Sequence, residues 1–218
     1  QIDKLEDANT FIDPRDGHKY KWVEIGNQTW MAENLAYMPH VNPPKKQEYG
    51  IWVYDYEGHD VAAAKATENY QKYGCLYDWT TAMDIDPKFL AGHWEGDSEN
   101  HQGLCPPGWR MPRDEDWTKI EVMLGLDPAY DKNASEWDLG YRTACGGLKL
   151  KSTRGWLSGG NGTNYLGLSM NPGGYRQNDE NKLSSQHHTG LGETGQYWTT
   201  FEYKDSLSNP PRKGFMQN

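Results

Sequence analysis

The sequence predicts an α+β domain with a small twisted antiparallel sheet, two or three helices and long loops. Composition is the first reason, because Trp, Tyr and Phe together number 28 while Leu, Ile and Val number 27. Since each large ring can bury about 150–250 Å², the core is expected to be aromatic. The 24 glycines and 12 prolines indicate many turns. Apolar residues recur with a period of two in some segments and at helical spacing in others, which predicts both kinds of element.

The N-terminal part of the chain predicts a β-hairpin. Tyr20–Ile25 and Thr29–Met31 flank a turn at Gly26-Asn27, and Trp22 alternates with Glu24 as expected of a half-buried strand. Further short strands are predicted from aromatic or apolar runs at residues 49–54, 108–111, 166–170 and 196–201.

Three other segments predict helical structure. Val61–Lys72 is rich in Ala, Lys and Glu and is expected to form a surface helix. Leu76–Met83 is expected to form a second short helix, and residues 134–146 to hold another helical turn.

The clearest helix signal lies in residues 105–117, CPPGWRMPRDEDW. Two prolines and a glycine favour an extended approach. Asp114–Asp116 then place three carboxylates in a first helical turn, where the helix dipole stabilises negative charge. Trp117, Ile120 and Leu124 follow on one helical face. The segment therefore indicates a folding nucleus rather than an active site.

Six segments resemble, in order, the motifs of the Fibrobacter succinogenes major paralogous domain, a module of secreted bacterial proteins related to the C-type lectin-like fold. They are residues 11–35, 73–79, 105–117, 146–156, 167–176 and 197–202. The resemblance implies a C-type lectin-like fold for a single domain over residues 10–218, preceded by a polar tether at residues 1–9. It also implies a secreted or cell-surface location, as an outer-membrane lipoprotein of a bacterium with a lipid anchor upstream of residue 1.

The cysteines depart from the family pattern. Family members usually end with a strand whose cysteine is a natural partner for Cys105, whereas this chain reaches Asn218 without that cysteine. We therefore expect that the terminal strand is missing or that the sheet closes differently. The three cysteines include no C-x-x-C pair, which disfavours a zinc or redox site. A disulfide with Cys105 as a member stays open, and Cys75 and Cys145 could be buried thiols.

The net charge of −9, from 31 acidic and 22 scattered basic residues, argues against two classes of partner. Nucleic acid needs a basic footprint that neutralises phosphates, and an anionic membrane surface would repel the protein. No apolar run approaches the ~20 residues of a membrane-spanning helix. The expected partner is a glycan or a cell-surface protein.

The loop His93–His101 is the first candidate binding site. Its carboxylates, Glu95 and Asp97, suit calcium, and the imidazole of His93 suits zinc. The spacing matches neither an EF-hand nor a zinc motif, so no cofactor is expected, with a structural calcium ion left open. Trp94 has polar neighbours in the sequence and is expected to be exposed for ligand contact. The alternative is a solvated acidic loop without a binding role.

The glycine-rich stretch 158–164 is the second candidate, with Asn161 and Asn164 as its ligand-binding residues. In C-type lectin-like folds the corresponding long loop often carries the ligand, although a flexible turn also explains the glycines. Tyr175 and Arg176 complete the expected set, with Tyr175 among several rings that could stack on a sugar. The triplets that bind sugars through calcium in true C-type lectins are absent from the sequence.

Catalytic motifs are not found in the sequence. It has no G-x-S-x-G elbow and no H-E-x-x-H motif, and no spacing singles out a glycosidase pair among its many carboxylates. We therefore expect a non-catalytic extracellular binding module. One alternative is a structural or adhesive subunit of a cell-surface assembly, completed by a partner's strand. The other, less favoured, is a glycan-active enzyme whose carboxylate pair the sequence does not reveal.

Overall fold

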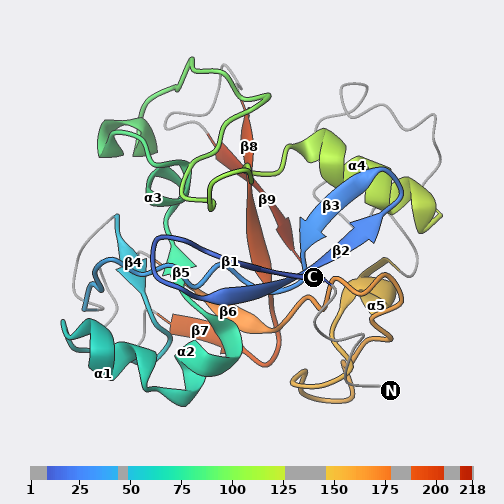
Figure 1. Ribbon diagram of the computed structural model, residues 1–218, viewed down its shortest axis with the longest axis horizontal. Coiled ribbons are helices and arrows are strands. Elements are labelled where there is room, and N and C mark those ends of the chain that lie inside the picture. The colour runs from blue at the N-terminus through green and yellow to red at the C-terminus, as the bar shows by residue number, and fades with distance from the viewer. Residues whose placement is uncertain (1–8, 44–48, 126–145, 178–187, 204–211, 218) are drawn as a thin grey trace.

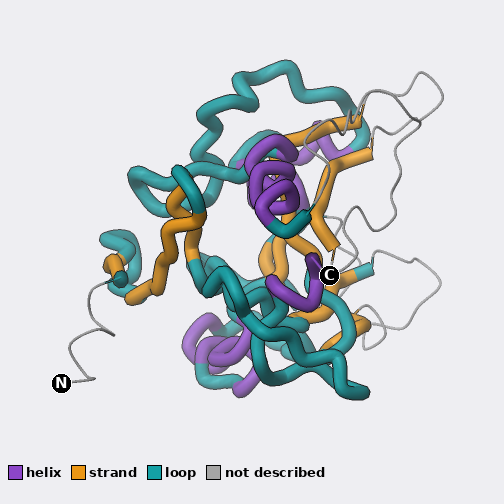
Figure 2. Tube along the Cα trace, turned by 90° about the vertical axis from the view of Figure 1, so that its right-hand side faces the viewer, coloured by secondary structure: helices purple, strands orange, loops and turns teal. Residues whose placement is uncertain are grey.

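The computed structural model describes residues 9–43, 49–125, 146–177, 188–203 and 212–217. Strands and short helices follow one another along the chain and are joined by long loops (Figure 1), and Figure 2 shows the same mixture from the side. The α+β prediction is therefore confirmed. The strands are β1 Thr10–Ile12, β2 Lys19–Ile25, β3 Gln28–Met31, β4 Ile51–Trp52, β5 Leu76–Tyr77, β6 Gly173–Arg176, β7 His188–Leu191, β8 Gln196–Tyr203 and β9 Arg212–Gln217. The helices are α1 Val61–Lys65, α2 Glu68–Tyr73, α3 Trp79–Met83, α4 Asp114–Met123 and α5 Gly146–Leu150, with a 3₁₀ turn at Pro87–Leu90.

The strands do not form the single small sheet that the sequence predicts. Within the described residues they pair antiparallel into four separate sheets, β1-β2-β3, β4-β5, β6-β7 and β8-β9. The β8–β9 ribbon runs through the middle of Figure 1, with the β2–β3 hairpin and α4 on one side and α3 on the other. Much of the backbone therefore lies in loops, whose buried polar groups need partners other than a sheet ladder.

The predicted hairpin and the motif helix are confirmed. β2 and β3 pair around a turn at Gly26, where φ is +63°, a conformation that glycine adopts without strain. α4 begins at Asp114, directly after Pro112 and Arg113. It buries Trp117 and Ile120 on one face, as their spacing predicts.

The two predicted N-terminal helices differ from the expectation. The 61–72 segment is divided between α1 and α2, because Thr67 leaves the helix and caps α2 by accepting a hydrogen bond from the Tyr70 amide (3.2 Å). Residues 76–83 begin as β5 rather than as a helix, and Asp78 then caps α3. In both places a residue that prefers an N-cap interrupts the helical pattern.

Two of the predicted strands are absent. Residues 108–111 form a loop, and residues 166–170 contribute an isolated bridge at Met170 in place of a strand. The helical turn predicted at residues 134–146 lies outside the described residues except for the first residue of α5, and the predicted tether lies outside them except for Asn9.

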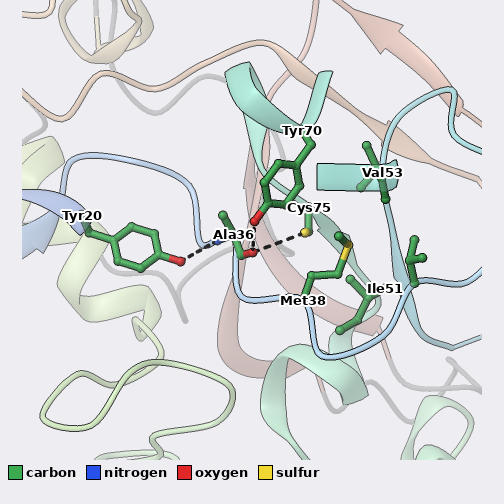
Figure 3. Packing of buried hydrophobic residues seen from close by; sticks show 9 residues of the cluster. Tyr20, Ala36, Met38, Ile51, Val53, Tyr70 and Cys75 are labelled. Carbon is green, nitrogen blue, oxygen red and sulfur yellow. Dashed lines mark hydrogen bonds between the residues drawn. The ribbon is translucent and has the colours of Figure 1, made fainter. Parts of the chain in front are cut away.

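Buried tyrosine hydroxyls satisfy the backbone of residues 35–37, which joins no strand and crosses a hydrophobic cluster that includes Met38, Ile51 and Val53. The Ala36 amide donates to the Tyr20 hydroxyl (3.0 Å), and the Tyr70 hydroxyl donates to the Ala36 carbonyl (2.9 Å), as Figure 3 shows. The Tyr77 hydroxyl lies 3.1 and 2.9 Å from the two flanking carbonyl oxygens. These hydroxyls come from β2, α2 and β5, so three elements are fixed to one loop.

The C-terminal strands are hydrogen-bonded to the β5–α3 segment. Trp79 Nε1 donates to the Thr199 carbonyl (2.9 Å), and Trp198 Nε1 donates to the Tyr77 carbonyl (2.7 Å). β8 is paired on one edge with β9, at Arg212–Gln217. A C-terminal strand is therefore present at these residues, while the domain bounds of 10–218 stay a prediction.

Tyr70→Phe removes the hydroxyl that satisfies the Ala36 carbonyl. We expect the free energy of unfolding to fall by about 1–3 kcal/mol, because a buried acceptor loses its hydroxyl donor and keeps only the weak donor Cys75 Sγ, 3.9 Å away. The control is Tyr165→Phe, whose ring is 73% exposed and whose loss should stay within about 0.5 kcal/mol. Urea unfolding followed by tryptophan fluorescence measures both, and equal stability of the two variants would contradict the role given to Tyr70.

Candidate functional site

A cavity of about 1250 Å³ lies where segments that are far apart in the sequence meet. Its wall comes from the β2–β3 turn, the start of α3, the loop 108–113 with the first turn of α4, β6 and the start of β8. The volume exceeds the roughly 300–1,000 Å³ of pockets for small molecules. The cavity therefore has room for an extended ligand.

Aromatic rings form much of the cavity wall. Among the described residues, six of the ten tryptophans line it: Trp30, Trp52, Trp79, Trp109, Trp117 and Trp198. Three of them, Trp30, Trp109 and Trp198, are only partly buried. The ring centroid of Trp30 lies 4.6 Å from that of Trp117, and the centroid of Trp109 lies 4.7 Å from that of Phe11. Neighbouring rings thus hold two of these partly buried indoles in place.

Asp116 is a buried charge on the wall, at the start of α4. Arg110 binds it with two hydrogen bonds, Nη1 to Oδ2 at 2.7 Å and Nη2 to Oδ1 at 3.0 Å. The Arg113 amide and Gln28 Nε2 donate to the same carboxylate. Burial alone would raise the pKa of Asp116, but the hydrogen bonds from Arg110 and Arg113 outweigh it and hold the pKa at about 2. Asp116 is therefore an ionised structural group and has no proton to donate at neutral pH.

The other two carboxylates on the described wall also have structural partners. Asp78 accepts hydrogen bonds from the Gly50 amide and the Thr80 hydroxyl, both at 2.6 Å. It accepts two more from the amide and hydroxyl of Thr81. Glu33 accepts a hydrogen bond from a backbone amide of β2 (2.9 Å). In the part of the wall that the structure describes, each carboxylate thus accepts hydrogen bonds from other parts of the chain and stabilises the fold.

Arg176, at the end of β6, differs from these paired charges. Its guanidinium carbon lies 4.1 Å from the centroid of the Trp52 ring, in cation–π contact. Its Nε and Nη2 atoms are buried, and neither makes a hydrogen bond to the described residues. Burial lowers the pKa of Arg176, and the charge of Asp78 opposes that shift. Arginine side chains are not deprotonated in proteins, so Arg176 is cationic.

All the described residues that line the cavity lie in a part of the chain that matches a known protein family. The model of the Fibrobacter succinogenes major domain matches residues 23–213, which include all the described wall residues. The chain belongs to this family. Neither a curated protein nor a solved structure matches it. The resemblance drawn from the sequence motifs is thereby confirmed, and the cavity lies within the family domain.

Two of the predicted site residues lie on the cavity wall of this family domain. Tyr175 and Arg176 are adjacent in β6 and both line the cavity. Tyr175 is partly buried, and its hydroxyl accepts a hydrogen bond from Gln177 Nε2 (3.1 Å). The remaining predicted residues are not brought to this wall.

Asn161 and Asn164 support their own loop. Asn161 Oδ1 accepts a hydrogen bond from the Trp156 amide (3.0 Å). Asn164 Oδ1 accepts from the Ser169 amide (2.7 Å), and its Nδ2 donates to the Ser169 hydroxyl (2.8 Å). Their amide groups therefore stabilise the turns of this loop, away from the cavity.

His93, Glu95 and Asp97 are exposed and do not line the cavity. His93 Nδ1 lies 3.7 Å from the Glu202 carboxylate, and Asp97 accepts a hydrogen bond from a backbone amide in its own loop. Across the described ranges, no three His, Cys, Asp or Glu side chains gather as a metal site would require. A structural calcium ion thus stays a prediction without support from these side chains.

The prediction of an exposed Trp94 is wrong. The residue is partly buried and packs against a hydrophobic cluster that includes Trp79, Met83 and Met111. Its ring centroid lies 6.3 Å from that of Trp79 and 4.8 Å from that of His101. The Trp94 amide also donates to the Glu202 carboxylate (2.9 Å). Polar sequence neighbours failed as a guide to exposure because the loop folds back onto α3.

The sequence did not predict that Trp30, Trp109 and Trp198 line a cavity. Each lies in a family motif beside core residues, and in the structure each is partly buried and also lines the cavity. The available signal was their number, since strands and helices this short cannot bury so many rings completely.

Cys75 and Cys105 are free thiols, each 8% exposed. The disulfide considered for Cys105 is therefore not formed in this structure, and Cys145 lies outside the described residues. Burial raises the pKa of both thiols to about 12. The two described cysteines thus behave as apolar core residues.

No helix among the described residues is both long enough and apolar enough to cross a membrane.

Asp116 should make stability depend on acid. Its pKa is about 2 in the folded chain against an ordinary 3.8, so its contribution of about 2 kcal/mol is complete above pH 5 and is lost as the pH falls towards 2. Asp116→Asn should lower the free energy of unfolding by about this amount at pH 7. In this variant the free energy of unfolding should also decrease less steeply as the pH falls. Urea unfolding at several pH values measures this, with exposed Glu95→Gln as the matched control. Parallel curves for Asp116→Asn and wild type would contradict this role.

The buried thiols should react only when the chain unfolds. At pH 8 a pKa of about 12 leaves roughly a thousandfold less thiolate than an ordinary cysteine has. We expect iodoacetamide to spare Cys75 and Cys105 in the folded protein and to label both in guanidinium chloride without reductant. Peptide mapping by mass spectrometry gives the result for each residue. Failure to label Cys105 until reductant is added would contradict the free thiol.

Proposed function

We propose that this family domain is a non-catalytic module that binds a glycan in the central cavity, outside the cell. The observation that supports it most is the set of partly buried indoles, Trp30, Trp109 and Trp198, around a space of about 1250 Å³. An indole face matches the apolar C–H face of a pyranose ring, and firmly held rings lose little conformational entropy on binding. Tyr175 adds a phenol ring to the same wall.

The carboxylates on the wall favour binding over catalysis. A glycosidase needs one carboxyl group to donate a proton and a second to act as base or nucleophile. Asp116 has a pKa of about 2 and is held by two arginines, while Asp78 caps α3. These groups serve the fold, so the glycan-active enzyme is the weaker proposal.

A C-type lectin-like fold and a place on the bacterial cell surface, as a lipoprotein, belong to the same proposal. The motif resemblance over residues 11–202 supports this part, together with small antiparallel sheets and long loops. An assembly subunit completed by a partner's strand would need an open strand edge near residues 196–201. β8 is paired with β9 along one edge, so a partner's strand would have to add to the other edge, which no strand of the described residues covers.

A glycan array followed by calorimetry tests the proposal, with each protein run with and without chelator. We expect specific binding by the wild type and a loss of about 10-fold or more in Tyr175→Ala, since a central aromatic contact is typically worth over 1 kcal/mol. The matched control is Tyr165→Ala, which removes a ring that is 73% exposed and lies off the wall.

Two results would contradict the cavity as the binding site. The first is silence of the wild type across a broad array. The second is binding lost in Trp94→Ala but kept in Tyr175→Ala, which would move the site to the His93–His101 loop. Near-ultraviolet circular dichroism of each variant verifies that the fold is retained.

A further inference from the structure

We propose that Arg176 makes the cavity selective for acidic saccharides by pairing with the carboxylate of a hexuronic acid. This inference rests on the proposed glycan-binding function and names the class of glycan. It is carried by the contacts of one guanidinium group and by their comparison with those of a second arginine in the same chain.

Arg176 is a cation held on the cavity wall without a hydrogen-bonded counter-ion among the described residues. The Trp52 ring, at 4.1 Å, covers one face of the guanidinium group. Nε and Nη2 are shielded from water and have no acceptor. Buried donors without partners cost free energy, and the cost is higher when the donor is charged. A ligand that brings an anionic acceptor would remove this cost.

The nearby carboxylate cannot serve as that acceptor without losing its own partners. Asp78 acts on Arg176 through its charge, but no hydrogen bond joins the two side chains. Its oxygens already accept bonds from Gly50, Thr80 and Thr81, and they cap α3. The charge of Arg176 is therefore moderated from a distance while its donors stay free.

Arg15 is an example in this chain of an aromatic-supported guanidinium group that is paired with a carboxylate. Its guanidinium carbon lies 3.9 Å from the centroid of the Tyr37 ring, so it too rests on an aromatic face. Its Nε and Nη2 atoms bind Asp13 with bonds of 2.9 Å to Oδ1 and 2.7 Å to Oδ2. Arg176 also rests on an aromatic ring, but its Nε and Nη2 have no carboxylate to bind among the described residues. Paired donors of this kind match a carboxylate better than a neutral hydroxyl.

The partly buried indoles and Arg176 together determine how the ligand binds. The sugar rings lie against the partly buried indoles, and the carboxylate on C5 of a hexuronic acid reaches Arg176. Binding therefore requires the Arg176 side chain to turn towards the cavity, because Nε and Nη2 are closed to water in this structure. An acidic peptide would satisfy the arginine but would leave the indole faces without the apolar ring faces that suit them.

Calorimetry with matched ligands tests the inference. The probes are the trisaccharides of galacturonate and of mannuronate, their carboxyl-reduced forms, which are neutral galactose and mannose trisaccharides, and triglutamate. The proteins are wild type, Arg176→Gln, Arg176→Lys and the control Arg154→Gln, which removes an exposed arginine away from the cavity. Thermal unfolding confirms that each variant is folded.

We expect the wild type and Arg154→Gln to bind at least one acidic trisaccharide about 10–100-fold more tightly than its reduced form. Arg176→Gln should abolish this preference and keep the affinity for the neutral form, and Arg176→Lys should keep a weaker preference because it restores the charge without the paired donors.

The failures are distinguishable. Equal binding of acidic and reduced forms, or a preference that survives in Arg176→Gln, overturns the role of Arg176 and leaves the glycan-binding proposal standing. Binding of triglutamate alone, lost in Arg176→Gln, overturns the saccharide and identifies an acidic peptide as the ligand. If the wild type binds none of these probes and is silent on the glycan array, both proposals fail. Binding of other, neutral glycans on the array with none of the acidic probes overturns this inference only.

Discussion

The backbone at Ala36 is the point on which much of this structure depends. Its amide and carbonyl are bonded to the hydroxyls of Tyr20 and Tyr70, and the Tyr77 hydroxyl reaches the carbonyls on either side. In a chain whose strands span two to eight residues, ladders satisfy only part of the buried backbone. Side chains that are large, apolar and able to form one hydrogen bond at the tip take over that task. Tyrosine meets all three requirements, and Tyr197 bonds the Asn171 carbonyl in the same way (3.0 Å).

The same chemistry connects the core with the cavity. Trp79 and Trp198 each donate an indole hydrogen bond to a backbone carbonyl, and each presents its ring to the cavity wall. Support and recognition are therefore not separated into different sets of residues. A substitution of one of these rings alters both the packing and the surface that a ligand would meet. A substitution of Tyr175 or Arg176, at the end of β6, removes none of the hydrogen bonds at Ala36.

Local patterns in the sequence predicted local structure well. The β2–β3 hairpin and α4 followed from period-two alternation and helical spacing, because both are decided by neighbours in the chain. The prediction of one helix over residues 61–72 was wrong at Thr67, because the preference of threonine for an N-cap outweighed the helix-forming residues around it. The site was less predictable. Tyr175 and Arg176 were expected to bind ligand, but nothing in the sequence placed them on the same cavity wall as Trp109. The polar residues around Trp94 gave no sign that its ring packs on Trp79. Contacts between distant segments leave no periodic trace in a single sequence.

The indole bonds that join β5 and α3 to β8 also govern the order in which the chain can fold. Trp79 and Thr199 are 120 residues apart, and Tyr77 and Trp198 are 121 apart. Closing loops of this length is slow relative to forming local helices and hairpins. During synthesis the N-terminal hairpin and α4 emerge long before their C-terminal partner does. Until residues 196–203 leave the ribosome, Trp79 lacks its β8 partner, and apolar surface that β8 covers in the folded chain stays exposed.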